Sequence, residues 1–177
     1  MMNTTIFAVI FPLLAAFAVW LIFRNKRLDR DRSVLAIVML VISAVELAVV
    51  LCYLLCDLGF FGFGFFAAEI YVGVSGLGLH FIYTGFRGVF AVITAFAWFV
   101  TFLYAKEFMK NDTRVIRYDF FNLLTLGATM GIFYAADFFT LFFFFEMMSF
   151  TSFMWVAHRQ TYASQYASGT YLGIAVA

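Results

Sequence analysis

Apolar runs long enough to cross a bilayer alternate with short polar breaks along the whole chain. A transmembrane helix needs about 20 predominantly apolar residues. Runs near that length predict five complete spans, at residues 4–23, 33–56, 81–104, 120–136 and 138–157. A sixth run begins near Tyr166 and reaches the last residue, Ala177. The pattern therefore predicts an all-α, polytopic membrane helix bundle with five full transmembrane helices and the start of a sixth, forming a single domain over residues 1–177.

The connections between these runs differ in length and composition. Asp137 is the one break between the fourth and fifth spans, so we expect a tight turn there. Residues 57–80 are rich in glycine and phenylalanine. Because glycine weakens helices, this segment is expected to fold back as an interfacial hairpin and not to span. The first 23 residues lack a basic segment and a small-residue cleavage site, which predicts a retained first span and not a cleaved signal.

Composition supports a membrane protein and excludes an ordinary soluble domain. Hydrophobic residues make up 66% of the chain and charged residues 12%, against about 25% charged residues in soluble domains. The net charge of +1 gives no reason to expect a nucleic-acid partner. The two cysteines, Cys52 and Cys56, are too few for an iron–sulfur cluster and are interpreted as small buried thiols. The sequence has no phosphate loop, nucleophile elbow or metal-ligand cluster, so we expect no cofactor, metal or catalytic chemistry in this chain.

Basic residues predict the orientation in the membrane. Ten of the eleven Lys and Arg residues follow the first, third or fifth predicted span, and therefore lie on one side: Arg24, Lys26, Arg27, Arg30, Arg32, Lys106, Lys110, Arg114, Arg117 and Arg159. Basic loops face the cytoplasm, so the N-terminus is predicted to lie outside a bacterial or archaeal plasma membrane. The eleventh, Arg87, falls inside the third predicted span. It either extends to the outer interface along its own stem or forms a buried pair.

Glu146 is the first candidate for function, because it lies in the middle of the most apolar stretch of the chain. A carboxylate at the centre of a span costs roughly 2.5–3.5 kcal/mol, and it is usually retained to pair, bind an ion or relay a proton. The alternative is a protonated carboxyl that holds helices together by a hydrogen bond. Ser149, three residues later, shares its helical face. Its hydroxyl either holds water beside the acid or bonds back to its own helix.

Other polar positions are weaker candidates. Glu46, in the middle of the second span, is equally compatible with proton movement and with a hydrogen bond that packs helices. Asp137 is interpreted as a water-facing turn residue. His80 and His158 are placed at opposite membrane edges, where an imidazole can titrate near neutral pH. Glycines at positions 127 and 131 form a small-residue stripe that lets another backbone approach closely.

Several stretches resemble a known family. Residues 72–81 (VGVSGLGLHF) and 104–109 (YAKEFM) resemble the segments that open and close the third helix of the antiporter-like subunits of respiratory complex I. Residues 120–137 and 141–153 (LFFFFEMMSFTSF) resemble the next two helices of the same family. The family also includes subunits of multisubunit Na⁺/H⁺ antiporters and of membrane-bound hydrogenases. The resemblance covers roughly residues 70–177.

The resemblance implies a role for Glu146, which matches the family's key glutamate on the fifth helix. In the family that glutamate pairs with a lysine on the seventh helix, and a water-lined lysine path follows. Two positions depart from the pattern: Ser75 stands where the family usually has Asp, and Phe145 where it usually has Trp. All three lysines here lie in loops. The resemblance therefore implies the N-terminal portion of a longer fold, or a separate chain that supplies the lysine helices.

The sequence thus predicts a membrane subunit that contributes Glu146, Glu46 and Ser149 to a path for protons or Na⁺. The resemblance implies a complex-I-like (NADH–quinone oxidoreductase), hydrogenase or cation/proton antiporter complex, with other membrane subunits and the lipid bilayer as partners. Two alternatives remain. One is a non-transporting assembly subunit in which Glu146 makes a structural hydrogen bond, and the other is a small stand-alone channel.

Overall fold

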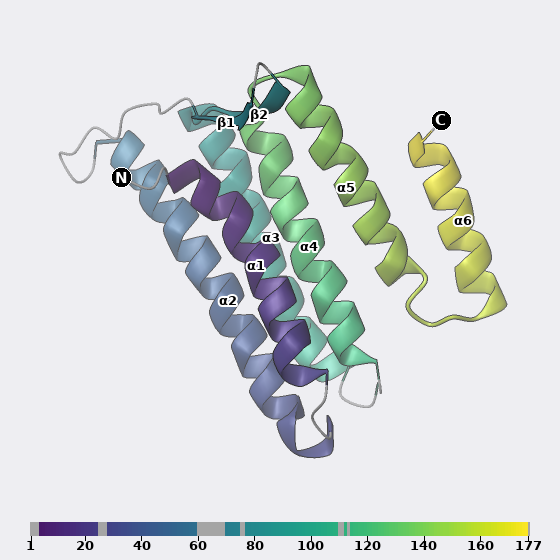
Figure 1. Ribbon diagram of the computed structural model, residues 1–177. Coiled ribbons are helices and arrows are strands. Elements are labelled where there is room, and N and C mark those ends of the chain that lie inside the picture. The colour runs from purple at the N-terminus through teal and green to yellow at the C-terminus, as the bar shows by residue number, and fades with distance from the viewer. Residues whose placement is uncertain are drawn as a thin grey trace.

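The structure is a computed structural model, and it describes residues 4–24, 28–59, 70–74, 77–109, 112 and 114–176. In these residues the chain forms long helices that run up and down, and one short hairpin (Figure 1). The elements in order are α1 (Thr4–Phe23), α2 (Leu28–Asp57), β1 (Ile70–Val74), β2 (Leu77–Phe81), α3 (Gly85–Phe108), α4 (Val115–Tyr134), α5 (Phe138–Val156) and α6 (Tyr162–Val176).

The first four helices form a ring. Helix α1 packs against both α2 and α4, α2 packs against α3, and α3 closes the ring against α4. Helix α5 lies on α4 outside this ring, and α6 lies on α5 (Figure 1). Apolar side chains from all four ring helices fill the interior, among them Val9, Met39, Ala95, Leu126 and Met130. We call these four helices the bundle, and α5 with α6 the arm.

Two glycines of α4 set how closely its neighbours approach. A methyl group on Gly127 would lie 2.6 Å from the side chain of Leu13 and 3.1 Å from the carbonyl oxygen of Val9. A methyl group on Gly131 would lie 2.3 Å from the ring of Phe144. Gly127 thus admits α1, and Gly131 admits α5. The small-residue stripe is confirmed as a packing feature.

The two ends of the molecule differ. The hairpin end carries the antiparallel pair β1–β2 and the α4–α5 turn, which are joined by backbone hydrogen bonds from Ile82 N–H to Tyr134 O (2.9 Å) and from Ala136 N–H to His80 O (2.8 Å). The basic end carries the α3–α4 and α5–α6 connections, with Lys106, Arg114 and Arg117 (Figure 1). The expected fold-back of residues 57–80 is present as this hairpin. Residues 60–69 and Ser75 lie outside the described residues.

The third helix begins later than predicted. The chain stays extended from the end of β2 to Thr84, which has φ −138° and ψ 151° and caps α3 by accepting a hydrogen bond from the Arg87 N–H. Helix α3 therefore starts at Gly85 and not at residue 81. Arg87 lies in its first turn, where its guanidinium donates to the Ala135 carbonyl at the end of α4. This contact is made to a backbone carbonyl and not to an acidic side chain, so it differs from the buried ion pair, whereas extension of Arg87 to the outer interface stays a prediction.

Four of the described helices are long and apolar enough to cross a membrane: residues 5–23 of α1, 33–57 of α2, and the whole of α3 and α5. Helix α4 was predicted as the fourth span, at residues 120–136, but it begins at Val115 and so also includes Arg117 and Asp119 besides Asn122. Helix α6 begins at Tyr162, earlier than predicted. The spanning helices present large apolar side chains outward, as lipid contact requires: Leu14, Ile37, Phe86, Ile93, Phe96, Phe138 and Phe142.

Candidate functional site

Glu46 lies inside the bundle and is fully buried. Its helix, α2, turns one stripe inward: Leu35, Met39, Ser43, Glu46 and Val50, each at most 2% exposed. Spacings of three and four residues put these side chains on one helical face. Neither carboxylate oxygen of Glu46 has a hydrogen-bond partner among the described residues. Helix periodicity thus forces an ionisable group into a mostly apolar interior.

Aromatic hydroxyls lie near Glu46 towards the hairpin end. The Tyr134 hydroxyl is within electrostatic range of Glu46, Tyr53 and Tyr83. The ring centroids of Tyr83 and Tyr134 are 6.0 Å apart. Both of these phenol oxygens are buried without a hydrogen-bond partner in the described part of the chain. Sequence reasoning missed these tyrosines, because an isolated Tyr in an apolar run is indistinguishable from a packing residue.

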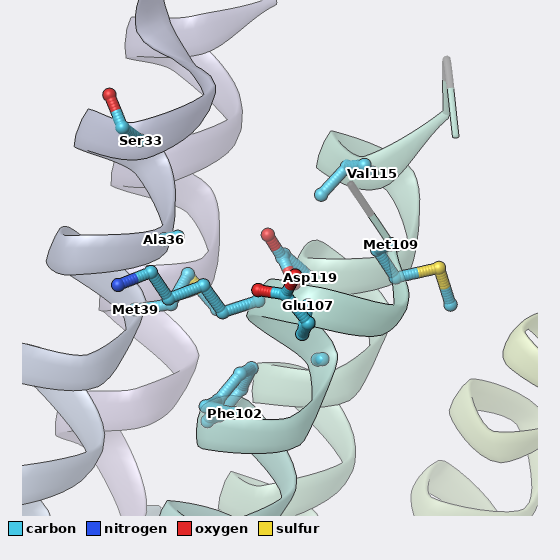
Figure 2. Close-up of a pocket in the computed structure, with 10 residues that line it drawn as sticks. Ser33, Ala36, Met39, Phe102, Glu107, Met109, Val115 and Asp119 are labelled. Carbon is cyan, nitrogen blue, oxygen red and sulfur yellow. The ribbon is translucent and has the colours of Figure 1, made fainter. Parts of the chain in front are cut away.

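A pocket of about 340 Å³ opens near the basic end, between α2, α3 and α4 (Figure 2). Its lining includes Met39, Lys106, Glu107 and Asp119. Asp119 is only 4% exposed, and its carboxylate accepts no hydrogen bond from a described residue. Sequence reasoning missed Asp119, because it directly precedes the predicted fourth span and looked like the polar edge of that span.

Asn122 follows Asp119 by one turn on α4. It is fully buried, and neither atom of its side-chain amide has a partner among the described residues. Its backbone carbonyl accepts a hydrogen bond from the Trp98 indole N–H at 3.2 Å. The bundle therefore holds unpartnered polar side chains on both α2 and α4.

Glu146 lies on the arm, in the middle of α5, and is half-buried. Its carboxylate makes no hydrogen bond or ion pair with a described residue. Ser149 is buried and donates to the Phe145 carbonyl at 3.0 Å, so the alternative in which it bonds back to its own helix is present. No interaction in the described chain joins Glu146 to Glu46, which lies within the ring. The predicted site residues thus fall into two places.

Hydroxyl pairs link α5 to the bundle and to α6. The Thr125 and Thr151 hydroxyls are 2.9 Å apart and link α4 to α5. The Ser152 and Tyr171 hydroxyls are 2.8 Å apart and link α5 to α6. Paired hydroxyls of this kind satisfy each other where water is scarce.

A clasp of side chains joins the two connections at the basic end. His158 Nε2 lies 2.9 Å from Asp112 Oδ2, and the Arg117 guanidinium donates to the His158 carbonyl at 3.0 Å. Arg114 also donates to the Gln160 side chain. Partial burial works against ionisation of Asp112, yet the Arg114 backbone N–H and the His158 ring together hold its pKa below its usual value. The clasp ties the bundle to the arm.

At the hairpin end, Asp137 caps α5 and accepts a hydrogen bond from the Thr140 N–H at 2.6 Å. This bond lowers the pKa of Asp137, and His80, 3.9 Å away, adds to the effect. The side chain is 38% exposed, which agrees with the predicted turn residue. The predicted tight turn is confirmed, and His80 and His158 lie at opposite ends.

The cysteines are both free, with Cys52 exposed and Cys56 buried. The prediction of two buried thiols is therefore wrong for Cys52, which lies on the outward side of α2. Among the described residues, no group of three or more His, Cys, Asp and Glu side chains could hold a metal ion.

Comparison with known proteins finds a solved structure with a similar fold. No protein-family model and no curated protein sequence matches the chain. The structure is similar to a chain of the membrane-bound sulfane sulfur reductase, an archaeal respiratory membrane complex, with a TM-score of 0.73 and 19% sequence identity. The match covers 95% of this chain and 33% of that one, so this chain spans about a third of its neighbour's length. The shared fold and the apolar helices identify an integral membrane protein.

Proposed function

We propose that this chain is a membrane subunit of a multisubunit, ion-translocating complex, and that Glu146 lies on its path for protons or Na⁺. The fold is shared with a chain of an archaeal respiratory membrane complex. The sequence resemblance to antiporter-like subunits of complex I covers the helix that carries Glu146. Other membrane subunits and the bilayer are the expected partners, and the loops at the basic end are expected to face the cytoplasm.

The observation that carries the proposal is the unpartnered state of Glu146. A half-buried carboxylate in the middle of an apolar helix, without a hydrogen bond to any described residue, is costly unless it serves an ion or a proton. All three lysines were predicted in loops, but Lys106 lies in the last turn of α3 at the basic end, and positions 26 and 110 fall outside the described residues. A cationic partner would therefore come from another segment or subunit.

The mechanism we propose is electrostatic. When a lysine approaches Glu146, the carboxylate stabilises the ammonium form and the lysine keeps its proton. When the two groups separate, the lysine releases that proton to the path. Ser149, whose hydroxyl proton is engaged by the helix backbone, keeps lone pairs with which it can accept from water beside the acid. Glu46 would serve as a second protonatable group within the bundle.

One observation favours a different function, that of an assembly subunit. Helix α5 exposes a broad aromatic surface that a partner subunit could cover, at Phe138, Phe139, Phe142, Phe143, Phe145 and Phe150. In that case Glu146 would only donate or accept a structural hydrogen bond across the interface.

Two substitutions at Glu146 separate these functions. We expect Glu146→Gln to reduce proton uptake into inverted vesicles to a small fraction of wild type, because Gln keeps the shape but removes the charge. Glu146→Asp should be milder, since it keeps the charge. A structural hydrogen bond predicts the reverse order, with Gln nearly harmless and Asp harmful, since one bond contributes only about 1 kcal/mol and depends on geometry.

Uptake is normalised to assembled complex, and Asp137→Asn is the matched control. The Asp137→Asn substitution removes a carboxylate from the hairpin end but keeps a side chain that can cap α5. Wild-type uptake in Glu146→Gln would reject the transport role and leave the assembly function. Parallel assays with and without Na⁺ distinguish the two ions.

A further inference from the structure

Two helix faces inside the bundle begin at the same pocket. On α2, Met39 lines the pocket, Ser43 follows one turn higher, and Glu46 lies about 10 Å above Met39 at 1.5 Å per residue. On α4, Asp119 lines the pocket, and Asn122 lies one turn higher on the same face. Figure 2 shows the carboxyl group of Asp119 among the side chains that surround the pocket. Polar side chains therefore continue from the pocket into the bundle on both helices.

These side chains have polar atoms without protein partners. Both amide atoms of Asn122 and both carboxylate oxygens of Glu46 are buried and make no hydrogen bond with the described residues. Asp119, more than nine-tenths buried, accepts none either. Buried polar groups are nearly always hydrogen-bonded, and an unpartnered one costs about 1–3 kcal/mol. Internal water is the usual partner when a polar space connects such groups.

We infer that Asp119, Asn122 and Ser43 line a hydrated half-channel that carries protons between the basic-end pocket and Glu46. The inference extends the proposed function, and it rests on that function for the direction in which protons move. The pocket supplies the aqueous entrance, with Lys106 and Glu107 among the charged groups that line it. Tyr118, which directly precedes Asp119 on α4, is the neighbouring titratable side chain.

The chemistry needs only proton exchange. The carboxylate of Asp119 takes a proton from a hydronium ion in the pocket, which leaves water, and passes it to water beside Asn122 and then to water beside Ser43. The Ser43 hydroxyl donates to the Leu40 carbonyl at 3.0 Å, so its oxygen can accept from that water. The proton then reaches the Glu46 carboxylate. This route lies inside the ring of four helices, whereas Glu146 lies on the arm, so the fold offers two separate acidic sites.

The first test measures hydration, independently of transport. In the assembled complex, with Cys52 and Cys56 replaced by Ser, Ser43→Cys is treated with a small water-soluble methanethiosulfonate. The control is Ala128→Cys, fully buried on α4 and nine residues, or about two and a half turns, from Asp119, which places it on the opposite helix face. We expect Ser43→Cys to react about tenfold faster or more, because thiolates form poorly in apolar surroundings.

Equal, slow rates for the two thiols would overturn the half-channel. Asn122→Cys is a second probe with the same expectation, in case Ser43→Cys fails to assemble. The second test measures proton uptake: Asp119→Asn should reduce it and Asp119→Glu should largely restore it, whereas wild-type uptake in Asp119→Asn would overturn the role of Asp119. Fast labelling of Ser43→Cys together with normal uptake in Glu146→Gln would reject the role of Glu146 and retain the half-channel.

Discussion

The bundle and the arm each carry a glutamate in the middle of an apolar helix, but the two glutamates differ in how deeply they are buried. The ring of α1–α4 encloses Glu46 completely. Helix α5 leaves Glu146 half-buried, on a helix whose phenylalanines are largely exposed. The same residue type thus has a closed interior around it in one region and a partly exposed face in the other. We therefore expect Glu46 to exchange protons with groups inside the bundle, and Glu146 to interact with a partner that covers the arm.

The packing of the two regions follows the same division. Glycine and aliphatic side chains let α1 and α4 approach closely. Gly131 likewise lets α5 approach α4, but hydroxyl pairs add to the packing of the arm and link α5 to α4 and α6 to α5. Helix α6 exposes Tyr162, Tyr166 and Ile174, so its outward face is unoccupied in the described structure. The arm is therefore the region whose environment should change most on assembly.

Among the substitutions that test the difference between bundle and arm, Gly131→Leu is expected to change the stability most. A side chain there meets the ring of Phe144, so it should force α5 away from α4 and lower the free energy of unfolding by about 3 kcal/mol or more. The matched control is Gly169→Leu on α6, where a methyl group would meet no atom within 4 Å. Thermal unfolding of the purified protein gives both values. Equal stability of the two variants would mean that the arm does not rest on Gly131.

Much of the fold follows from hydropathy and local chemistry. The runs at residues 4–23 and 138–157 coincide almost fully with α1 and α5, because each is predominantly apolar and is bounded by a polar residue or a cap. The start of α3 could not be placed, because the extended segment before Thr84 is held by hydrogen bonds to the α4–α5 turn. Such long-range bonds leave no local signal in the sequence.

The candidate site was only partly predictable for a similar reason. Glu46 and Glu146 stand out because a charge within an apolar run is costly wherever it points. Their different burial depends on which helices pack against α2 and α5, and spacing alone does not give that. Asp119 and Asn122 were missed because a polar residue near the end of a span usually faces water. Here α4 starts earlier and turns both residues into the bundle.

Glu46→Leu is expected to have a smaller effect on stability and to raise the free energy of unfolding. Replacing an unpartnered buried carboxyl by an apolar side chain of similar volume is often neutral or stabilising, here by about 1–4 kcal/mol. Glu146→Leu should change the stability of the isolated protein by less than about 0.5 kcal/mol, because its side chain is partly exposed and makes no bond with a described residue. Denaturant unfolding in detergent compares the two. Destabilisation by Glu46→Leu would show that Glu46 has a bonding partner in the bundle.

The smallest effect concerns the clasp that ties the arm to the bundle at the basic end. The folded-state pKa of Asp112 lies below its unfolded value, which is about 3.9. Its ionised form therefore stabilises the protein above about pH 4, and this contribution is lost as the pH falls through the lower, folded-state pKa. Because Asp112 is partly exposed, we expect Asp112→Asn to cost less than about 1 kcal/mol at neutral pH. The difference from wild type should vanish as the pH falls below 4 in a series of melting temperatures. A difference that instead grows towards low pH would mean that Asp112 binds His158 as a neutral acid, and that the clasp is not an ionic contact between bundle and arm.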